Sequence, residues 1–228
     1  MRVLGLVPAR GGSRRVPGKN LSRLGGQTLV RRALERSLAA GCFALVALSS
    51  DDEAVLAEAD GLDVALVRRP PELATDTSTA ADAALHALQV VDDGGDPFEA
   101  LAIVQCTSPF TAPDDLAGAV ELLERTGAES VVSVVRVAAA QHPRKLKRLE
   151  GDRLLPYLED DPLTPSHELP PLWVRNGSVY VFRRDVVERG LEADDVRGYE
   201  MPPERSFDID TAEDLAFAKF LVGRGDRA

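Results

Sequence analysis

Val3-Leu-Gly-Leu-Val7 runs directly into Pro8-Ala-Arg-Gly-Gly-Ser-Arg-Arg-Val-Pro-Gly-Lys-Asn20, so a short apolar run is followed by a glycine-rich turn with several cations. Glycines let the backbone bend and bring N–H groups close to an oxyanion, while arginine and lysine side chains neutralise its charge. Ligands of open α/β sheets bind beyond the carboxyl ends of the strands, and this turn leaves its strand at that end. The stretch therefore predicts a first β-strand that ends in a phosphate-binding turn.

Two other phosphate-binding motifs do not fit this turn. A Walker A loop has four residues between its first glycine and the Gly-Lys-Ser/Thr, but five residues separate Gly12 from Gly18, and Asn20 stands where the hydroxyl should be. A dinucleotide fingerprint needs Gly-x-Gly-x-x-Gly, and here Gly11 and Gly12 are adjacent. The remaining alternative, a surface loop with solvated arginines, explains fewer of these features.

The first 135 residues alternate Val/Leu/Ala-rich runs with helix-length amphipathic stretches. This alternation is typical of βαβ units, so we expect an α/β fold with a mostly parallel, doubly wound, Rossmann-like sheet. Thr28 and Asp114 are expected to cap helices, and Gly41 and Gly127 to follow helix ends. The predicted strands lie near 2–7, 44–49, 63–67, 100–105 and 130–135, and the predicted helices near 28–40, 52–59, 79–91 and 114–126.

The alternation stops between about 138 and 171, where prolines, mixed charges and short hairpin-like apolar pieces take its place. We interpret this segment as an insertion in a single domain that spans residues 1–228. Regular order returns with a strand from Val174 to Phe182, then Asp208-Ile-Asp210 and a closing helix near 212–222. A chain of 228 residues with 44% hydrophobic content can bury one substantial core.

Acidic residues outnumber basic ones, 37 to 27, which gives a formal net charge of −10. This charge would repel a nucleic-acid backbone, whereas a small anionic ligand in one basic turn is compatible with it. We therefore expect a small-molecule partner and no nucleic acid. No membrane partner is expected either, because no membrane span or secretory signal is visible. Cys42 and Cys106 do not indicate disulfides or zinc, and we expect a cytoplasmic protein.

Asp208-Ile-Asp210 places two carboxylates two residues apart. In an extended segment both project from one face, so both could reach one Mg²⁺ ion, which prefers oxygen ligands and keeps waters and substrate phosphates. The alternative is structural, because Asp210 or Thr211 could cap the last helix, with Thr211 and Asp214 forming a capping box. The two roles are compatible.

Two further polar clusters follow predicted strands. Gln105-Cys-Thr-Ser-Pro109 ends a buried strand, where it could contact the polar edge of a base or sugar or simply form a turn. Arg69-Pro-Pro-Glu-Leu-Ala-Thr-Asp-Thr-Ser-Thr79 joins an arginine to a hydroxyl-rich helix entry, which helix capping also explains. Cys106 has no partnered histidine, so we interpret it as a small buried thiol.

Taken in order, these segments resemble the cytidylyltransferase family that activates acidic sugars, whose members include the acylneuraminate cytidylyltransferases, also called CMP-sialic acid synthetases. The resemblance covers nearly the whole chain. It rests on Pro8-Ala-Arg-Gly-Gly-Ser13 with Pro17-Gly-Lys-Asn20, on Arg69-Pro-Pro-Glu-Leu-Ala74, on Gln105-Cys-Thr-Ser-Pro109, on Asn176-Gly-Ser-Val-Tyr180 and on Asp208-Ile-Asp-Thr211.

The resemblance implies a nucleotidyltransferase-type fold and a Mg²⁺-dependent transfer of CMP from CTP to a sugar acid, with release of pyrophosphate. It also implies a homodimer in which the segment near 138–171 lends residues to the neighbouring site. The catalytic residues would be Arg10, Lys19, Asp208 and Asp210, of which Asp208 and Asp210 would hold the metal. The nucleotide would be bound by Ala9, Arg10, Gly11, Ser13, Lys19, Asn20, Arg69 and Ser78, and the acceptor by Gln105, Lys145, Arg175 and Tyr180.

The departures from the family pattern concern the acceptor. Members that act on sialic acid usually carry an arginine two residues before the Asn-Gly pair, where this chain has Val174, with Arg175 beside it. A shift of one residue points a side chain to the opposite face of a regular strand. Leu191-Glu192 stands about where an aromatic pair would be, and Cys106 replaces a common proline. Sialic acid, another nonulosonic acid, an octulosonic acid and a phosphonate therefore stay open as acceptors. A preference for another nucleotide and an inactive nucleotide-binding regulatory protein also stay open.

Overall fold

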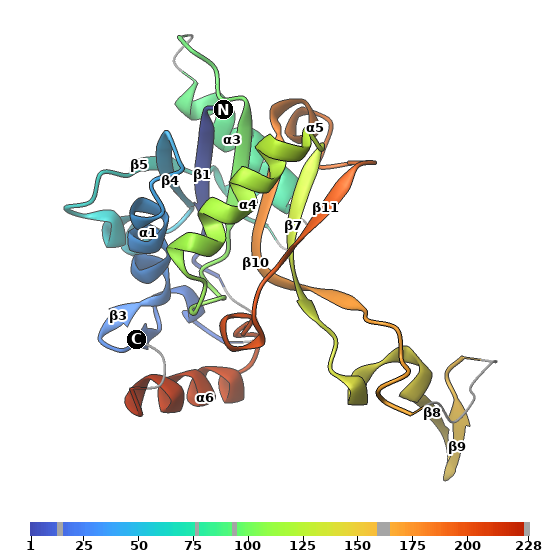
Figure 1. The fold of residues 1–228 in the computed structure, drawn as a ribbon. Helices are drawn as coiled ribbons and strands as arrows, with labels where there is room; N and C mark the ends of the chain where they lie inside the picture. The colour runs from blue at the N-terminus through green and yellow to red at the C-terminus, as the bar shows by residue number, and fades with distance from the viewer. Residues whose placement is uncertain (13–15, 76–77, 93–94, 159–164, 226–228) are drawn as a thin grey trace.

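The computed structural model describes residues 1–12, 16–75, 78–92, 95–158 and 165–225, and its centre is a seven-stranded sheet (Figure 1). The strand order is β11-β7-β10-β6-β1-β4-β5. β10 is antiparallel to both of its neighbours and every other pairing in this sheet is parallel, which confirms the mostly parallel sheet. The strands are β1 (Val3–Pro8), β4 (Leu45–Ser50), β5 (Ala65–Arg68), β6 (Ala100–Val104), β7 (Ser130–Arg136), β10 (Trp173–Arg183) and β11 (Val196–Glu200).

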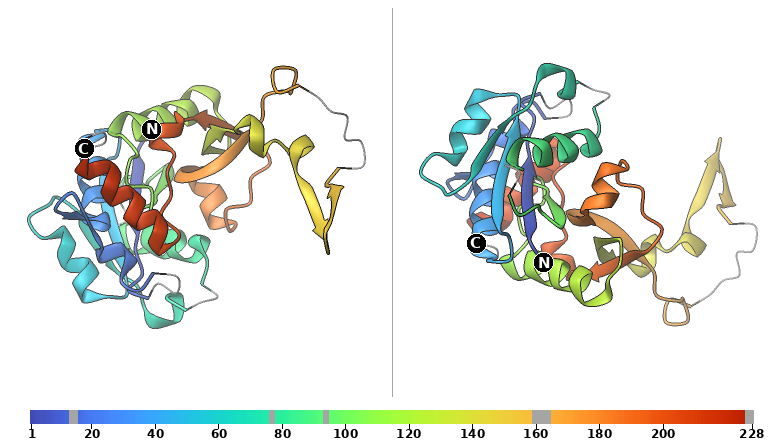
Figure 2. Two further views of the ribbon diagram at one scale, coloured as in Figure 1. Left: turned by 90° about the horizontal axis from the view of Figure 1, so that it is seen from below. Right: turned by 90° about the horizontal axis from the view of Figure 1, so that it is seen from above.

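Helices cover both faces of the sheet, as a doubly wound fold requires (Figure 2). One apolar core lies between the sheet and α1, α4 and α6, and a second lies between the sheet and α3 and α5. The α-helices are α1 (Leu29–Ala39), α2 (Glu53–Leu56), α3 (Ala80–Val91), α4 (Pro113–Thr126), α5 (Arg184–Glu188) and α6 (Ala212–Gly223). Short 3-10 turns are η1 (Lys19–Leu21), η2 (Ala57–Ala59), η3 (Pro71–Leu73), η4 (Ala139–Gln141), η5 (Pro143–Lys145) and η6 (Pro203–Arg205).

The helix ends mostly follow the predicted capping chemistry. The Thr28 side chain accepts the Arg31 N–H at the start of α1, and Gly127 ends α4 with a φ of 66°. The prediction that Asp114 caps α4 is wrong, because the cap position is Ala112 and Pro113 begins the helix. Asp115 instead accepts the Ala112 N–H at 2.9 Å, since a carboxylate in the first turn can reach back to the free backbone donor.

The sequence pattern did not predict α5 and β11, which complete one edge of the sheet. β11 pairs in parallel with β7 along its whole length. Its sequence, Val196-Arg-Gly-Tyr-Glu200, contains a glycine and two charged residues, so its β-propensity is weak. Pairing with a buried neighbour makes this segment a strand.

β10 contains a bulge that changes which side chains share a face. Arg175 pairs with Val134 and Tyr180 with Val132, so β10 advances five residues while β7 advances two. In a regular strand two residues five apart would point to opposite faces, but here both lie opposite β7 residues that share a face. Arg175 therefore lies on the same face as Tyr180. Gly177, with a φ of 78°, provides the left-handed turn within the bulge.

Between Arg136 and Trp173 the chain leaves the sheet and forms a projecting arm (Figure 1). The arm carries η4, η5 and a two-stranded hairpin of β8 (Lys147–Glu150) and β9 (Arg153–Pro156). Leu149 and Leu154 on the hairpin are 69% and 67% exposed. A second small hairpin, β2 (Arg23–Leu24) with β3 (Gln27–Thr28), follows the first turn.

Candidate active site

The turn after β1 meets the last sequence motif at one end of the sheet. Gly18, with a φ of 64°, directs the chain into η1, where the Lys19 side chain is 13% exposed. Its Nζ donates to the Ile209 carbonyl oxygen at 2.6 Å and lies 3.7 Å from Asp210 Oδ1. The fold therefore places a nearly buried cation beside the carboxylates of Asp208 and Asp210, although Lys19 and Ile209 are 190 residues apart in the chain.

Asp208 also lies near this cation, and it is more buried than Asp210. Its Oδ1 is buried and has no hydrogen-bond partner among the described residues. Burial raises the pKa of this carboxyl, and the charge of Asp210 raises it further, while a hydrogen bond from Thr107 and the charge of Lys19 oppose the shift. A buried carboxylate oxygen without a donor is an electrostatic cost, and a cation would remove it.

Gly177 lies where Asp208 approaches the bulge of β10. A Cβ atom at this position would be in ordinary van der Waals contact with Asp208 Oδ2, at 3.4 Å, so it is the positive φ of 78° that favours glycine here. Beneath this contact, Asn176 donates to Ser206 Oγ at 2.8 Å, while its own oxygen accepts the hydroxyl of Ser133 at 2.6 Å. This buried network fixes the bulge against the segment that leads into Asp208.

Asn20 connects the turn to the end of β6. Its Nδ2 donates to the Arg10 carbonyl oxygen at 2.8 Å, and its Oδ1 accepts the thiol of Cys106 at 3.2 Å. The orientation of the amide is determined, because a carbonyl oxygen can only accept and a thiol can donate. Burial raises the pKa of Cys106 to about 12, so the thiol keeps the proton that this hydrogen bond needs.

Ser49 and Asp51 hold the turn from the end of β4, and the sequence pattern did not predict this role. Asp51 Oδ1 accepts the Gly11 N–H at 3.0 Å, and the Ser49 carbonyl oxygen accepts the Ala9 N–H at 2.9 Å. Ser49 also accepts three hydrogen bonds from the guanidinium of Arg69, two at its hydroxyl and one at its carbonyl oxygen. A signal was present, because the polar run Ser49-Ser-Asp-Asp52 begins at the end of a buried strand that is parallel to β1.

Arg69 is held between the turn and the entry to α3. Burial lowers its pKa, the charge of Asp51 raises it, and the charge of Arg10 lowers it, so the two arginines are close enough to interact. Ser78 lies further along the same connection. Its hydroxyl accepts a hydrogen bond from the Thr75 N–H at 3.0 Å and donates one to the Glu72 carbonyl oxygen at 3.4 Å. Ser13, the remaining predicted nucleotide contact, lies outside the described residues.

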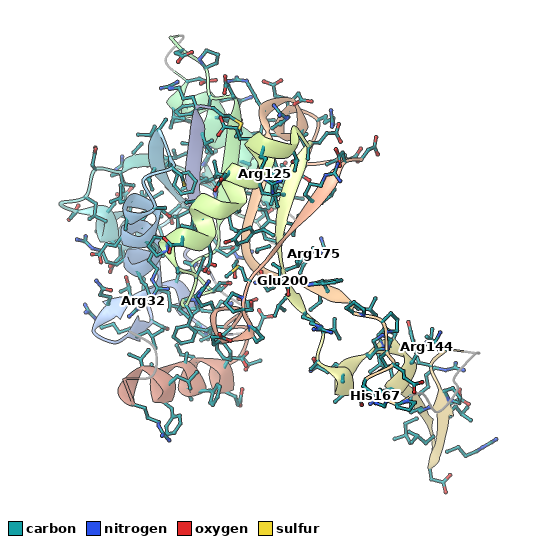
Figure 3. The ribbon with its side chains drawn as sticks, viewed as in Figure 1. Arg32, Arg125, Arg144, His167, Arg175 and Glu200 are labelled. Carbon is teal, nitrogen blue, oxygen red and sulfur yellow. The ribbon has the colours of Figure 1, made fainter. Side chains whose placement is uncertain are left out.

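Gln105, Arg175 and Tyr180 line one cavity of about 580 Å³ on the α3 side of the sheet. Figure 3 shows Arg175 where β10 leaves the body of the protein. Burial raises the pKa of Tyr180, while the charge of Arg175 lowers it and that of Asp208 raises it. Tyr180 is therefore close enough to Asp208 for the two groups to interact, which places the cavity next to the carboxylate site. A volume of this size lies within the usual range for small-molecule sites.

Lys145 does not lie with these residues within one chain; it belongs to the segment near 138–171, which the family resemblance implies lends residues to the neighbouring site. It ends η5 in the arm, and its Nζ contacts the hydroxyl of Ser166. Its neighbour Arg144 is visible on the arm in Figure 3, well separated from Arg175. The physical reason is that the insertion carries this segment away from the sheet.

Two carboxylates, those of Asp208 and Asp210, are the groups at this site that could hold a metal ion. No group of three or more histidine, cysteine, aspartate or glutamate side chains that could hold a metal occurs among the described residues. Asp208 and Asp210 therefore suit an ion that takes its remaining ligands from water and from substrate, as Mg²⁺ does. In the part of the chain that the structure describes, no helix has the length and apolar character needed to cross a membrane.

A family model described as cytidylyltransferase matches residues 4–221. The chain is 30% identical over 227 residues to a CMP-N,N'-diacetyllegionaminic acid synthase of Legionella pneumophila, with 97% of each protein covered. It is 31% identical over 231 residues to N-acylneuraminate cytidylyltransferase A of Danio rerio, which covers 97% of this chain and 51% of that protein. The chain thus spans nearly all of the first relative and about half of the second.

Solved structures show the same fold. A CMP:2-keto-3-deoxy-manno-octonic acid synthetase complexed with CTP matches with a TM-score of 0.71 and 20% identity, covering 99% of this chain and 100% of that one. A 4-diphosphocytidyl-2C-methyl-D-erythritol synthase from Anaerococcus prevotii matches with a TM-score of 0.66 and 12% identity, covering 98% and 99%. At these identities the likeness concerns the fold alone.

Proposed function

The chain belongs to the cytidylyltransferase family, and from this membership we propose that it transfers the CMP group of CTP to an acidic sugar, releasing pyrophosphate. The observation that carries the proposal is the position of Lys19, within 3.7 Å of Asp210 and beside Asp208. A phosphate-binding turn and a carboxylate pair at one point of the sheet are what nucleotidyl transfer requires.

In the proposed reaction an acceptor hydroxyl oxygen forms a bond to the α-phosphorus of CTP, the bond to the β-phosphate oxygen breaks, and a proton is released. The negative charge of the departing pyrophosphate needs cations that are already in place, since preorganised charge is the main contribution of the protein to such a transfer. Arg10 and Lys19 supply it from the turn after β1.

We further propose that Asp208 and Asp210 hold Mg²⁺ when CTP is bound. The buried, unpartnered Oδ1 of Asp208 supports this, because a divalent cation would satisfy it. When bound, the ion would polarise the phosphate oxygens and help to activate the attacking hydroxyl. The residues of the chain have a separate task, which is to orient both reactants and limit the access of water.

CTP and the sugar acid are proposed to bind at two neighbouring parts of the site. Arg69 and Ser78, at the entry to α3, are proposed to lie around the cytidine, with Ala9, Gly11, Ser13 and Asn20 forming the remainder of the nucleotide site. Gln105, Arg175 and Tyr180 in the 580 Å³ cavity are proposed to bind the acceptor. The guanidinium of Arg175 is suited to an acidic sugar because it binds a carboxylate with two parallel hydrogen bonds.

A homodimer is proposed as the working form, in a cytoplasmic location where CTP is available. The arm exposes Leu149 and Leu154, which a second copy would cover. In such a dimer Lys145 would reach the acceptor site of the neighbouring chain rather than its own. The dimer thus accounts for a cation that is remote from the cavity of its own chain.

The proposed function is tested with the purified chain, CTP, MgCl₂ and N-acetylneuraminic acid or N,N'-diacetyllegionaminic acid. Pyrophosphate release coupled to a CMP adduct in the mass spectrum is the expected result, and EDTA should abolish it. CTP binding without turnover of any acid would support an inactive regulatory protein instead. Comparing the thermal shifts from CTP, UTP, ATP and GTP tests the choice of nucleotide.

A further inference from the structure

The segment between β11 and α6 carries Asp208 and Asp210 but has little regular structure of its own. Within residues 201–211 the one element is the single turn η6. Strands and helices are held in place by their ladders of backbone hydrogen bonds, whereas an irregular segment takes its position from other contacts with its neighbours. The position of the proposed metal carboxylates therefore depends on what this segment touches.

The segment lies along the connection that leads from β6 into α4. The Ile209 N–H donates to the Thr107 carbonyl oxygen at 2.9 Å, and the Thr107 side chain makes a hydrogen bond with Asp208. The rings of Phe207 and Phe110 follow, with centroids 6.0 Å apart, a separation typical of aromatic pairs. Residue numbers fall along one segment as they rise along the other, so the two segments run side by side in opposite directions.

Arg205 makes a third contact between the two segments, three residues before Asp208. Its Nε and Nη2 each donate to one oxygen of Asp115 at 2.8 Å. The Asp115 side chain is 1% exposed, and it also accepts the Ala112 N–H in the first turn of α4. Two parallel hydrogen bonds fix the orientation of both groups as well as their separation. The pair therefore fastens η6 to the start of α4.

Given the function proposed above, on which this inference rests, we infer that Arg205 is a positioning residue for Asp208, the proposed Mg²⁺ ligand. Arg205 is not one of the proposed metal or substrate contacts. It acts through Asp115, which holds the irregular segment against the β6–α4 connection and so keeps Asp208 beside Thr107. Outer contacts that orient metal ligands typically change metal affinity or activity by about 10–100-fold. Loss of this pair should therefore weaken the use of Mg²⁺ more than the binding of CTP.

The test variant combines Arg205→Met with Asp115→Asn. It removes both charges, so no buried charge is left without a partner, and the new amide still offers an oxygen to the Ala112 N–H. Ser206 stays bonded to Asn176, so the segment keeps a second attachment. With saturating CTP and a sugar acid that the parent uses, the free Mg²⁺ concentration for half-maximal pyrophosphate release should rise about 10-fold or more. At saturating Mg²⁺, KM for CTP should stay near the parent value.

A second readout needs no turnover, because it uses CTP without any acceptor. The free Mg²⁺ concentration that gives half of the Mg²⁺-dependent rise in Tm should increase by a similar factor in the double variant. Arg205→Lys keeps the charge and can make one of the two hydrogen bonds, so its Mg²⁺ requirement should lie between those of the parent and the double variant. If the double variant does not fold, Arg205→Lys decides alone, and an unchanged requirement would contradict the inference.

The matched control combines Arg184→Met with Asp92→Asn. Arg184 Nη1 lies 2.6 Å from Asp92 Oδ2, and this partly buried pair joins α5 to the C-terminal end of α3. It touches neither the segment before Asp208 nor the β6–α4 connection. Its removal should leave the Mg²⁺ requirement at the parent value, whatever the change in Tm.

A double variant with a lower Tm but the Mg²⁺ requirement of the parent would overturn the inference, because the pair would then only stabilise the fold. An equal rise in the Mg²⁺ requirement of the control would overturn it as well, since the effect would not be specific to this pair. Both results leave the proposed function intact. A parent protein that releases no pyrophosphate with either acid would instead refute the proposed function, and the inference with it.

Discussion

Asp208→Asn should make the protein more stable and nearly inactive. Burial disfavours the charged form of Asp208, as its raised pKa indicates, and Asn removes that charge; a buried polar group that is not fully compensated costs about 1–3 kcal/mol. We expect a value near the low end, about 1 kcal/mol, because the side chain is only partly buried and other hydrogen bonds to the carboxylate remain. For a chain of this size that corresponds to a rise in Tm of about 2–4 °C. Loss of one preorganised group should lower kcat by about 10²-fold or more.

The effect on stability should depend on pH in one direction. Burial raises the pKa of Asp208 above 3.8, so the folded protein binds this proton more tightly than the unfolded chain. The stability that the proton provides is complete below the unfolded pKa and is lost as the pH rises through the folded pKa. The variant keeps a neutral group throughout, so its advantage in Tm should be absent near pH 3 and should grow toward neutral pH.

The assay is thermal unfolding in EDTA across this pH range, followed by turnover with CTP and MgCl₂. Asp210→Asn is the matched control, because Asp210 lies beside Lys19 and its side chain is 54% exposed. This control should lose activity without any gain in Tm. An Asp208→Asn variant that unfolds at a lower temperature than the parent at pH 7.5 would contradict the cost of this buried charge, and normal turnover would contradict the role of Asp208 in the reaction.

Three further outcomes are expected. Lys19→Ala should lower kcat by about 10²–10³-fold with a CD spectrum like the parent's, whereas Lys219→Ala on the surface of α6 should behave as the parent; equal effects would contradict the role of Lys19. Burial raises the pKa of Cys106 to about 12, so the stability contributed by its protonated thiol is complete below pH 9 and is lost only as the pH approaches 12; iodoacetamide at pH 8 should label Cys106 after unfolding but not before, as read by mass spectrometry. Leu149→Asp should weaken self-association in light scattering while leaving CTP binding unchanged, and a parent protein that is monomeric at micromolar concentration would contradict the proposed dimer.

Short-range patterns in the sequence predicted most of the fold. The five strands and four helices expected in the first 135 residues all form, because apolar periodicity and capping chemistry act over a few residues. The Asp114 cap failed for a local reason, since the proline at position 113 takes the first helical position. β11 could not be predicted, because its strand conformation depends on pairing with β7, which is distant in sequence.

The chemistry of the site could be predicted from the sequence, because the turn from Pro8 to Asn20 and the Asp208–Asp210 pair are each local arrangements of charge and backbone freedom. Which of these residues lie side by side depends on the tertiary fold. The bulge in β10 brings Arg175 onto the face of Tyr180, against the alternation of a regular strand, and the arm carries Lys145 away from both. Side-chain type is written in the sequence, but its direction and neighbours depend on strand register and chain crossing, which are set by contacts between distant segments.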